Sequence, residues 1–407
     1  MGKQFLSKGQ FADALTHYHA AVDQDPSNYQ TLYRRATVYL AMGKSRSALP
    51  DLDKVIELKP DFTAARLQRA NVLLKQGDLD SALIDYEAIL AKEPNNSEVA
   101  SHVAVIQPTR ENIKLGVASF DRGDLESAEY YLTKAIEVCP WNFDLREKRA
   151  ECYEHMGQIP KAIAEVRATT KLLQDNTESF LKLSLLYYSS GDPEESLTQI
   201  RECLRLEPEH KKCFPHYKKV KKLVKQREQL HEAVQNSQWD ECIQKAEKVL
   251  QTDSTTASIR LATDTSLCRC HSQGGDPSEA IRLCTRVLEE DPENVNVLCD
   301  RADAFINNEE FEKAINDFNE AAEKNDESRR AKEGLNKAQK LLKQSKRRDY
   351  YKILGLRRTA TKQQVMKAYR KLAQKWHPDN FSSDEEKKQA EAKFIDIASA
   401  KEVLTDP

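Results

Sequence analysis

Glycine and proline are scarce in this sequence, with 12 and 14 residues among 407. Because both residues interrupt regular helices, their scarcity beside abundant Ala, Leu, Lys, Glu and Gln favours long helices over strands. No run of 18 apolar residues is present, so we expect no membrane span. The stretch after Met1 also lacks the apolar segment of a secretory signal, so an exported form would have this sequence as its mature or trimmed part.

Charge of one sign is not in excess, since 63 basic residues face 65 acidic ones. The composition therefore gives no reason to expect a nucleic-acid partner. No glycine-rich phosphate loop, metal-ligand cluster or nucleophile motif is found, which predicts a protein that is not an enzyme and needs no cofactor. None of the nine cysteines forms a CxxC pair, and the single CxC, Cys268-Arg269-Cys270, has no partner pair at zinc-finger spacing, so we expect no metal site.

An internal repeat dominates what is present. Pro26, Pro60 and Pro94 lie 34 residues apart, which is the period of the tetratricopeptide repeat. Gly43 and Gly77 follow the same period and predict the turn between the two helices of a unit. Small residues that would allow the helices to approach closely recur in step: Ala36, Ala48, Ala70 and Ala82. An ordinary helical bundle would not keep this phase.

Two insertions divide the repeats into groups of three. The spacing grows to 46 residues between Pro94 and Pro140 and again between Pro208 and Ser254, so we expect long helices near Asn95–Gly116 and Glu209–Leu230. The predicted fold is all-α: a superhelical rod of nine tetratricopeptide repeats, the first truncated at Met1, followed by a small helical domain. The expected boundaries are 1–94, 95–208, 209–328, a capping helix with a basic hinge at 329–348, and a C-terminal domain at 349–407.

The first helices of the repeats would line a concave and largely apolar groove. Such a groove suits exposed apolar segments of non-native polypeptide, because burial of apolar surface tolerates many sequences. For any one residue, packing against a neighbouring repeat is an equally good interpretation. The lysines and asparagines of a clamp for acidic chaperone tails are not found in three consecutive repeats. The candidate groove residues are Tyr33, Leu40, Leu67, Leu74, Ile113 and Phe120.

The pattern changes after the basic run at Lys343–Arg348. Thr361 and Gln364 form a capping box that starts a helix over Lys362–Trp376, and a second amphipathic helix is expected near Glu385–Leu404. The sequence His-Pro-Asp lies between them, where proline prevents the first helix from continuing. The loop residues are His377, Pro378 and Asp379, and the first helix carries the basic residues Lys367, Arg370, Lys371 and Lys375.

This stretch resembles the J domain of DnaJ-type co-chaperones, from its Asp-Tyr-Tyr opening to Ala-Lys-Glu-Val-Leu-Thr-Asp-Pro. The resemblance implies that the His377-Pro378-Asp379 loop and the basic helix dock on a DnaK-type chaperone and stimulate its ATP hydrolysis. The alternative is that the basic residues form only a solvated face. Family members continue into a fourth helix beyond the point that corresponds to Asp406-Pro407.

The order of repeats and J domain is similar to that of lumenal members of this family across the whole chain. The resemblance implies a monomeric co-chaperone in the endoplasmic reticulum lumen that binds unfolded clients and hands them to the DnaK-type chaperone BiP. A second hypothesis is a regulator that inhibits kinases of a translation initiation factor through its repeats. A cytosolic adaptor between heat-shock chaperones is disfavoured because the clamp is missing.

The cysteines leave two interpretations open. Cys203 and Cys213 flank a repeat junction, while Cys268 and Cys284 occupy facing positions of one repeat. Either pair could approach bonding distance, but buried reduced thiols are the simpler interpretation of the residues alone. The resemblance to lumenal proteins favours two disulfides, Cys203–Cys213 and Cys268–Cys284, and structural roles for the rest, including Cys139, Cys152 and Cys242. Two glycosylation patterns, Asn95-Asn96-Ser97 and Asn380-Phe381-Ser382, are weak signals.

Overall fold

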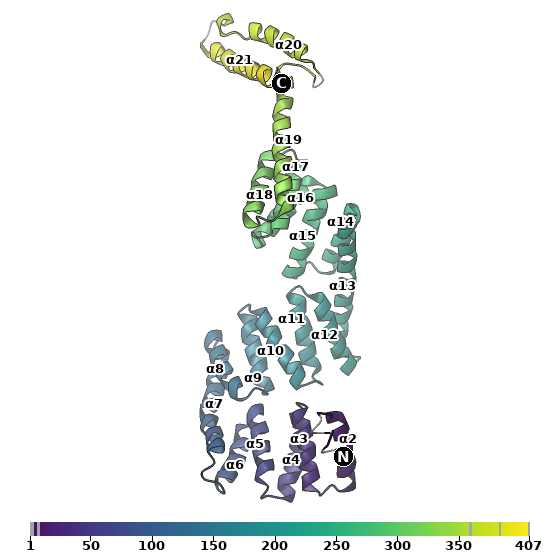
Figure 1. Cartoon of the computed structure of the whole chain (residues 1–407), viewed down its shortest axis with the longest axis vertical. Helices are drawn as coiled ribbons and strands as arrows, with labels where there is room; N and C mark the ends of the chain where they lie inside the picture. Colours follow the sequence, from purple (N-terminus) through teal and green to yellow (C-terminus); the bar gives the residue numbers. More distant parts are fainter. Residues whose placement is uncertain (1–3, 6–8, 358–359, 382–383, 406–407) are drawn as a thin grey trace. The chain divides into compact units, whose positions relative to one another are not determined.

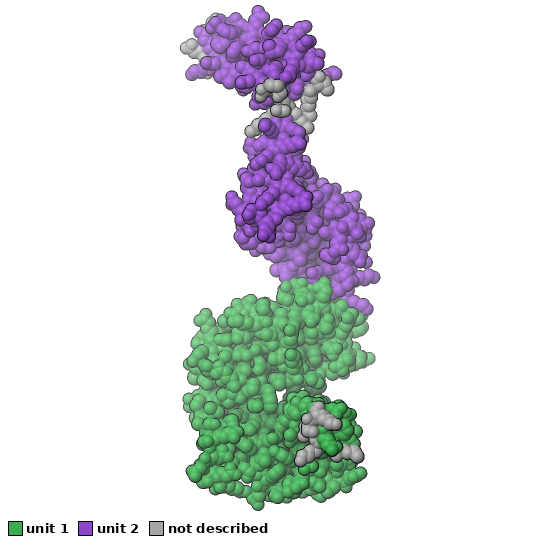
Figure 2. Space-filling view, in the orientation of Figure 1, with its two compact units in different colours: residues 1–220 green, residues 221–407 purple. Residues whose placement is uncertain are grey.

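The computed structural model describes residues 4–5, 9–357, 360–381 and 384–405, and all regular structure within these ranges is helical (Figure 1). This confirms the predicted all-α class, with helical repeats followed by a small C-terminal helical domain. The chain divides into two compact units, residues 1–220 and 221–407 (Figure 2).

Helices adjacent in sequence pack as pairs, one pair to each repeat. The first unit contains α2 (Phe11–Gln24), α3 (Tyr29–Ala41), α4 (Ser45–Leu58), α5 (Thr63–Gln76), α6 (Leu79–Leu90), α7 (Ser97–Asp121), α8 (Leu125–Val138), α9 (Phe143–His155), α10 (Ile159–Leu172), α11 (Thr177–Ser189) and α12 (Pro193–Leu206). Helix α13 (Cys213–Gln235) begins in this unit and ends in the second.

The second unit continues with α14 (Trp239–Thr252), α15 (Ala257–Gly274), α16 (Pro277–Glu290), α17 (Val295–Asn307), α18 (Phe311–Lys324) and α19 (Arg329–Ile353). The C-terminal domain adds α20 (Lys362–Lys375), the short 3-10 helix η1 (Pro378–Asn380) and α21 (Asp384–Thr405). Among the described residues, none of the helices is both long and apolar enough to cross a bilayer.

The repeat landmarks have the structural roles that their spacing predicts. Gly43 and Gly77 adopt φ of 72° and 88°, a left-handed conformation that ends the first helix of a pair and that glycine adopts without steric cost. Ala36 and Ala70 are fully buried where two helices meet, so a larger side chain would force them apart. Asparagine then caps the first helix of several repeats by accepting a backbone N–H bond: Asn28, Asn96, Asn142, Asn176 and Asn294.

The two insertions lengthen first helices, as expected. Helix α7 has 25 residues and α13 has 23, whereas their second-helix partners α8 and α14 each have 14. Helix α19 differs from the prediction. Its backbone stays helical through the basic run Lys343–Arg348, where a hinge was expected, and ends only at Ile353. This run contains no glycine or proline, so nothing in its covalent structure stops the helix.

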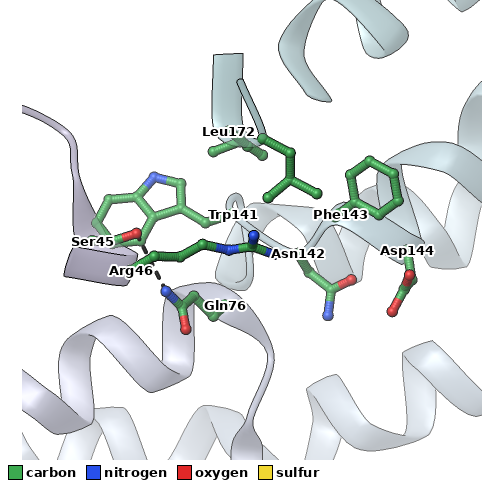
Figure 3. A pocket seen from close by; sticks show the side chains of 9 residues that line it. Ser45, Arg46, Gln76, Trp141, Asn142, Phe143, Asp144 and Leu172 are labelled. Carbon is green, nitrogen blue, oxygen red and sulfur yellow. Dashed lines mark hydrogen bonds between the residues drawn. The ribbon is translucent and has the colours of Figure 1, made fainter. Parts of the chain in front are cut away.

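A pocket of about 210 Å³ lies in the first unit where the N-terminus of α9 approaches the end of α5 (Figure 3). Trp141 forms one wall, and Arg46 extends across its mouth toward Asn142. Gln76 donates a hydrogen bond of 3.3 Å to the Ser45 hydroxyl, which is drawn beside Trp141. Polar and aromatic side chains therefore line the pocket together.

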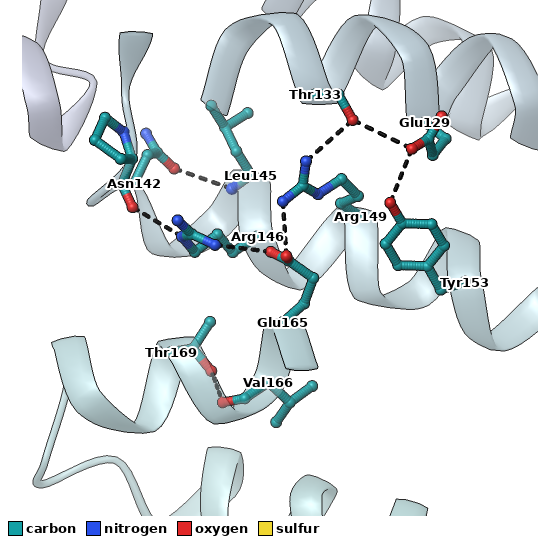
Figure 4. A network of polar contacts seen from close by, with 11 residues as sticks. Glu129, Thr133, Asn142, Leu145, Arg146, Arg149, Tyr153, Glu165, Val166 and Thr169 are labelled. Atoms are coloured by element: carbon teal, nitrogen blue, oxygen red, sulfur yellow. Dashed lines mark hydrogen bonds and ion pairs between the residues drawn. The ribbon is translucent and has the colours of Figure 1, made fainter. Parts of the chain in front are cut away.

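Buried ion pairs join the two helices of several repeats. In the fifth repeat Arg149 binds Glu165 at 2.7 Å, and Arg146 binds the same carboxylate at 3.0 Å (Figure 4). The same separation of 16 residues recurs in other repeats in the pairs Arg35–Asp51, Arg69–Asp85 and Arg301–Asp317. Because each carboxylate is largely buried, the pairing arginine removes the cost of an unpaired internal charge.

Candidate functional site

The C-terminal domain is built around a small apolar core between α19, α20 and α21. Leu354, Val365 and Ile397 are buried at its centre. The predicted capping box is confirmed: the Gln364 carboxamide oxygen accepts from the Thr361 backbone N–H at 2.8 Å, and the Thr361 hydroxyl accepts from the Gln364 N–H at 3.4 Å. The capping box fixes the start of α20, and the shared core packs the buried face of α20 against α21.

The His-Pro-Asp sequence forms an exposed turn directly after α20. His377 accepts a hydrogen bond on Nδ1 from the Asp379 N–H at 3.4 Å, and Pro378 starts the 3-10 helix η1. The side chains of His377 and Asp379 are 51% and 87% exposed, so both are available to a partner. The imidazole also makes an edge contact with the Phe394 ring on α21, with centroids 5.7 Å apart.

Residues on either side hold this turn in place. The Asn380 carboxamide donates to the Gln374 carbonyl at 2.7 Å and so closes the turn onto the end of α20. Trp376 stacks on Phe381, and the Lys393 ammonium of α21 lies 3.8 Å from the centre of the indole ring. The turn is thus supported by both helices, which leaves His377 and Asp379 exposed on a fixed backbone.

The four predicted basic residues all lie exposed on α20. Ion pairs within the described part of the chain use none of them: Lys367, Arg370, Lys371 and Lys375. Lys367 and Lys371 lie one helical turn apart and border an open pocket of about 480 Å³. Leu356 and Ala368 contribute apolar surface to the same pocket. The face therefore offers unpaired positive charge beside an apolar patch, which suits an acidic surface with some apolar character.

The candidate groove residues are less accessible than the sequence suggested. Leu74 is only 5% exposed and belongs to the core between α5 and its neighbours, so little of its side chain is accessible to a client. A helix position that is partly exposed in one repeat can be covered by a neighbouring helix in another. The other five are half-buried at the edges of the cores: Tyr33, Leu40, Leu67, Ile113 and Phe120.

Aromatic contacts fix part of this surface. The Tyr33 ring meets the Phe62 ring edge-on at 4.9 Å, and burial raises the pKa of the Tyr33 hydroxyl. The Lys148 ammonium lies 5.0 Å from the centre of the Phe120 ring. Asn71 accepts a hydrogen bond from the Tyr86 hydroxyl at 2.6 Å and is therefore engaged within its own repeat.

Six cysteines pair in the structure. Cys203–Cys213 and Cys268–Cys284 are joined as the resemblance implied, with Cα atoms 6.5 and 5.0 Å apart. A third disulfide, Cys242–Cys270, was missed, because Cys242 was assigned an unpaired structural role. Cys268 and Cys270 are neighbours in the CxC of α15, and they bond to different helices, α16 and α14.

Three cysteines remain unpaired, and one histidine lies next to a disulfide. Cys139, Cys152 and Cys299 are buried, and desolvation raises the pKa of each thiol to about 11, so these groups stay protonated and unreactive at neutral pH. His210 lies beside the sulfurs of Cys203 and Cys213 in an arrangement that could hold a metal ion. Because those sulfurs are bonded to each other, they are not available as thiolate ligands.

Comparison with known proteins agrees with this architecture. The DnaJ domain model matches residues 349–407, and tetratricopeptide repeat models match residues 2–43, 33–97, 119–183, 177–210 and 273–339. The crystal structure of the P58(IPK) TPR domain superposes with a TM-score of 0.74 at 47% identity, covering 84% of this chain and 97% of that one. Fold and motifs together define a co-chaperone class that carries tetratricopeptide repeats and a J domain.

The relatives identify the family within this class. DnaJ homolog subfamily C member 3 from Mus musculus and from Homo sapiens are each 51% identical over 410 residues, which cover all of this chain and 81% of each relative. The Gallus gallus protein of the same name is 48% identical over 409 residues. The chain belongs to the DnaJ homolog subfamily C member 3 family.

Proposed function

We propose that this protein is a lumenal co-chaperone of the endoplasmic reticulum that binds unfolded polypeptide through its repeats and stimulates ATP hydrolysis by BiP through its J domain. The observation that carries the proposal is the exposed His377-Pro378-Asp379 turn, supported by both α20 and α21 beside an unpaired basic face. No group in the chain is proposed to hydrolyse ATP. The chain acts on the conformation of the partner that does.

The basic face supports the docking step. Lys367, Arg370 and Lys371 project from a single helix and are exposed, so an acidic surface on the partner would gain attraction with little rearrangement of this domain. Such pairing steers encounter and weakens with salt. The turn residues would then make the contacts that distinguish productive docking from electrostatic attraction alone.

Two further observations support the other parts of the proposal. The half-buried apolar residues of α3, α5 and α7 offer adaptable surface for client segments, Leu74 excepted. The three disulfides support an oxidising compartment, because cytosolic thiols are kept reduced. The disulfides fit a protein of the lumen better than a cytosolic adaptor.

The test is single-turnover ATP hydrolysis by BiP, measured with this chain and with its His377→Gln variant. We expect the parent to accelerate hydrolysis and the variant to lose the acceleration. His231→Gln, which replaces an exposed histidine of α13, should behave as the parent. Equal rates with parent and His377→Gln, given a folded J domain, would contradict the proposal and favour a function carried by the repeats, such as regulation of a kinase.

A further inference from the structure

The turn between α6 and α7 carries an acceptor pattern for N-linked glycans that the co-chaperone function does not use. Asn95, Asn96 and Ser97 form an Asn-X-Ser sequence without proline in the middle position. Asn95 and Ser97 are exposed, and Ser97 is the first residue of α7. The pattern therefore lies at a surface turn of the first unit, where a bulky modification meets no packed neighbour.

Of the three residues, Asn96 makes the local hydrogen bonds, and the side chain of Asn95, the glycan acceptor, takes part in none of them. Asn96 caps α7: its carboxamide oxygen accepts from the Val99 N–H at 3.1 Å, and its nitrogen donates to Glu93 at 3.0 Å. Within the described part of the chain, no side-chain hydrogen bond is made by Asn95 or by Ser97. Substituting the Asn95 nitrogen would consequently cost no native contact and leave the cap intact.

The second such pattern in the chain, at Asn380, has a different setting. The Asn380 nitrogen donates to the Gln374 carbonyl at 2.7 Å and closes the His-Pro-Asp turn, so a glycan there would break that bond and cover the docking loop. Its third residue, Ser382, lies outside the described residues. The structure thus distinguishes the two patterns, and only Asn95 combines exposure with an unused nitrogen.

We propose that Asn95 carries an N-linked oligosaccharide, an inference that rests on the proposed lumenal location. The co-reactant is a polyprenyl diphosphate-linked oligosaccharide of that compartment. The bond between its first sugar carbon and the diphosphate oxygen breaks, a bond from that carbon to Asn95 Nδ2 forms, and the diphosphate leaves with the electron pair. The amide proton lost from Nδ2 goes to a base of the transferase, and no atom is oxidised or reduced.

The experiment uses the full-length protein expressed in eukaryotic cells, with and without peptide N-glycosidase treatment. We expect a mobility shift that the glycosidase removes and that is absent in Asn95→Gln and in Ser97→Ala. Ser97→Thr keeps the acceptor pattern and should keep the shift. Because neither residue 95 nor 97 contributes to the cap, all these variants should fold as the parent does, which their thermal transitions would verify.

Protease protection in intact microsomes separates the inference from the proposed function. If the chain is protected but shows no glycosidase-sensitive shift, or if the shift persists in Asn95→Gln, the inference is overturned and the lumenal location stands. If the chain is digested without detergent, the proposed location fails and the inference fails with it. A protected chain whose shift depends on both Asn95 and Ser97 establishes the site.

Discussion

The backbone N–H of Trp141 donates to the carbonyl of Lys75 at 2.8 Å, and the Lys75 ammonium lies 4.9 Å from the centre of the Trp141 ring. These residues are 66 positions apart, one at the end of α5 and the other just before α9. The contact therefore ties the third repeat to the fifth and skips the repeat between them. Trp141 is also one of the residues that line the pocket of Figure 3.

Gly77 lies close to Asn142, the residue after Trp141 that caps α9, so its replacement should be unusually costly. A Cβ atom at position 77 would overlap the Asn142 carboxamide, and the residue has φ of 88°. Gly43 has a similar φ of 72° but would meet nothing within 4 Å. Gly43→Ala should lower the free energy of unfolding by about 1 kcal/mol through backbone strain alone.

Gly77→Ala should cost more than Gly43→Ala, by a further 1 to 3 kcal/mol on the order typical of overpacking. Urea denaturation of both variants beside the parent measures the difference. Equal losses would show that the approach of Asn142 to Gly77 contributes nothing and that only the left-handed backbone matters at this turn.

Periodicity alone was sufficient to predict the repeat architecture. Each landmark residue has one structural role within its repeat, such as the turn at Gly43 or the close helix approach at Ala70. Because the same role recurs in every repeat, these residue types recur at a constant spacing in the sequence. The contact between Lys75 and Trp141 produces no periodic pattern in the sequence, because it occurs once. It also depends on how the long helix α7 redirects the chain. The arginine–carboxylate pairs could have been found, since Arg35 and Arg69 are one period apart and each precedes its acid by 16 residues.

Substitutions on the first helix α3 should weaken client binding, and a substitution on the second helix α6 provides the control. Tyr33→Gln together with Leu40→Gln should reduce suppression of client aggregation several-fold, because both side chains contribute half-buried apolar surface to α3. Ile84→Gln removes a side chain that is 65% exposed on the second helix α6 and should leave suppression unchanged. Light scattering of a denatured client measures both. Unchanged suppression by a folded double variant would refute the groove assignment.

The J-domain site could largely be predicted from the sequence, whereas the accessibility of the groove residues could not. The His377 turn is specified by contiguous residues: a capping box starts α20, proline ends it, and an aromatic pair flanks the turn. Accessibility in the groove depends on which neighbouring helix covers each position. Leu40 and Leu74 occupy equivalent repeat positions, yet only Leu74 is fully covered. The spacing of residues in the sequence determines on which face of its helix a residue lies. It does not determine which neighbouring helix packs on that face.

The disulfide that was missed also yields a measurable expectation. Cys242→Ala with Cys270→Ala should lower the free energy of unfolding of the second unit by about 3 kcal/mol, because the cross-link closes a loop of 28 residues in the unfolded chain. Cys299→Ala, which removes a buried unpaired thiol, serves as the control for loss of side-chain volume. Under reducing conditions the double variant and the parent should converge. A difference that persists with reductant would assign the loss to packing and contradict a cross-link effect.

His216 should make the stability of the first unit depend on pH. Its Nε2 lies 3.1 Å from the Ser184 hydroxyl, and burial, with a smaller contribution from the Lys219 charge, lowers its pKa from 6.5 to about 4. As the pH falls below 6.5, His216 becomes protonated in the unfolded chain but stays neutral in the folded chain. The stabilisation present at pH 7 is therefore lost progressively toward pH 4. The expected loss between pH 7 and pH 5 is roughly 2 kcal/mol. Denaturation of the parent and of His216→Gln at both pH values tests this: the variant should lack that part of the pH dependence, and parallel losses in the two proteins would show that other groups cause it.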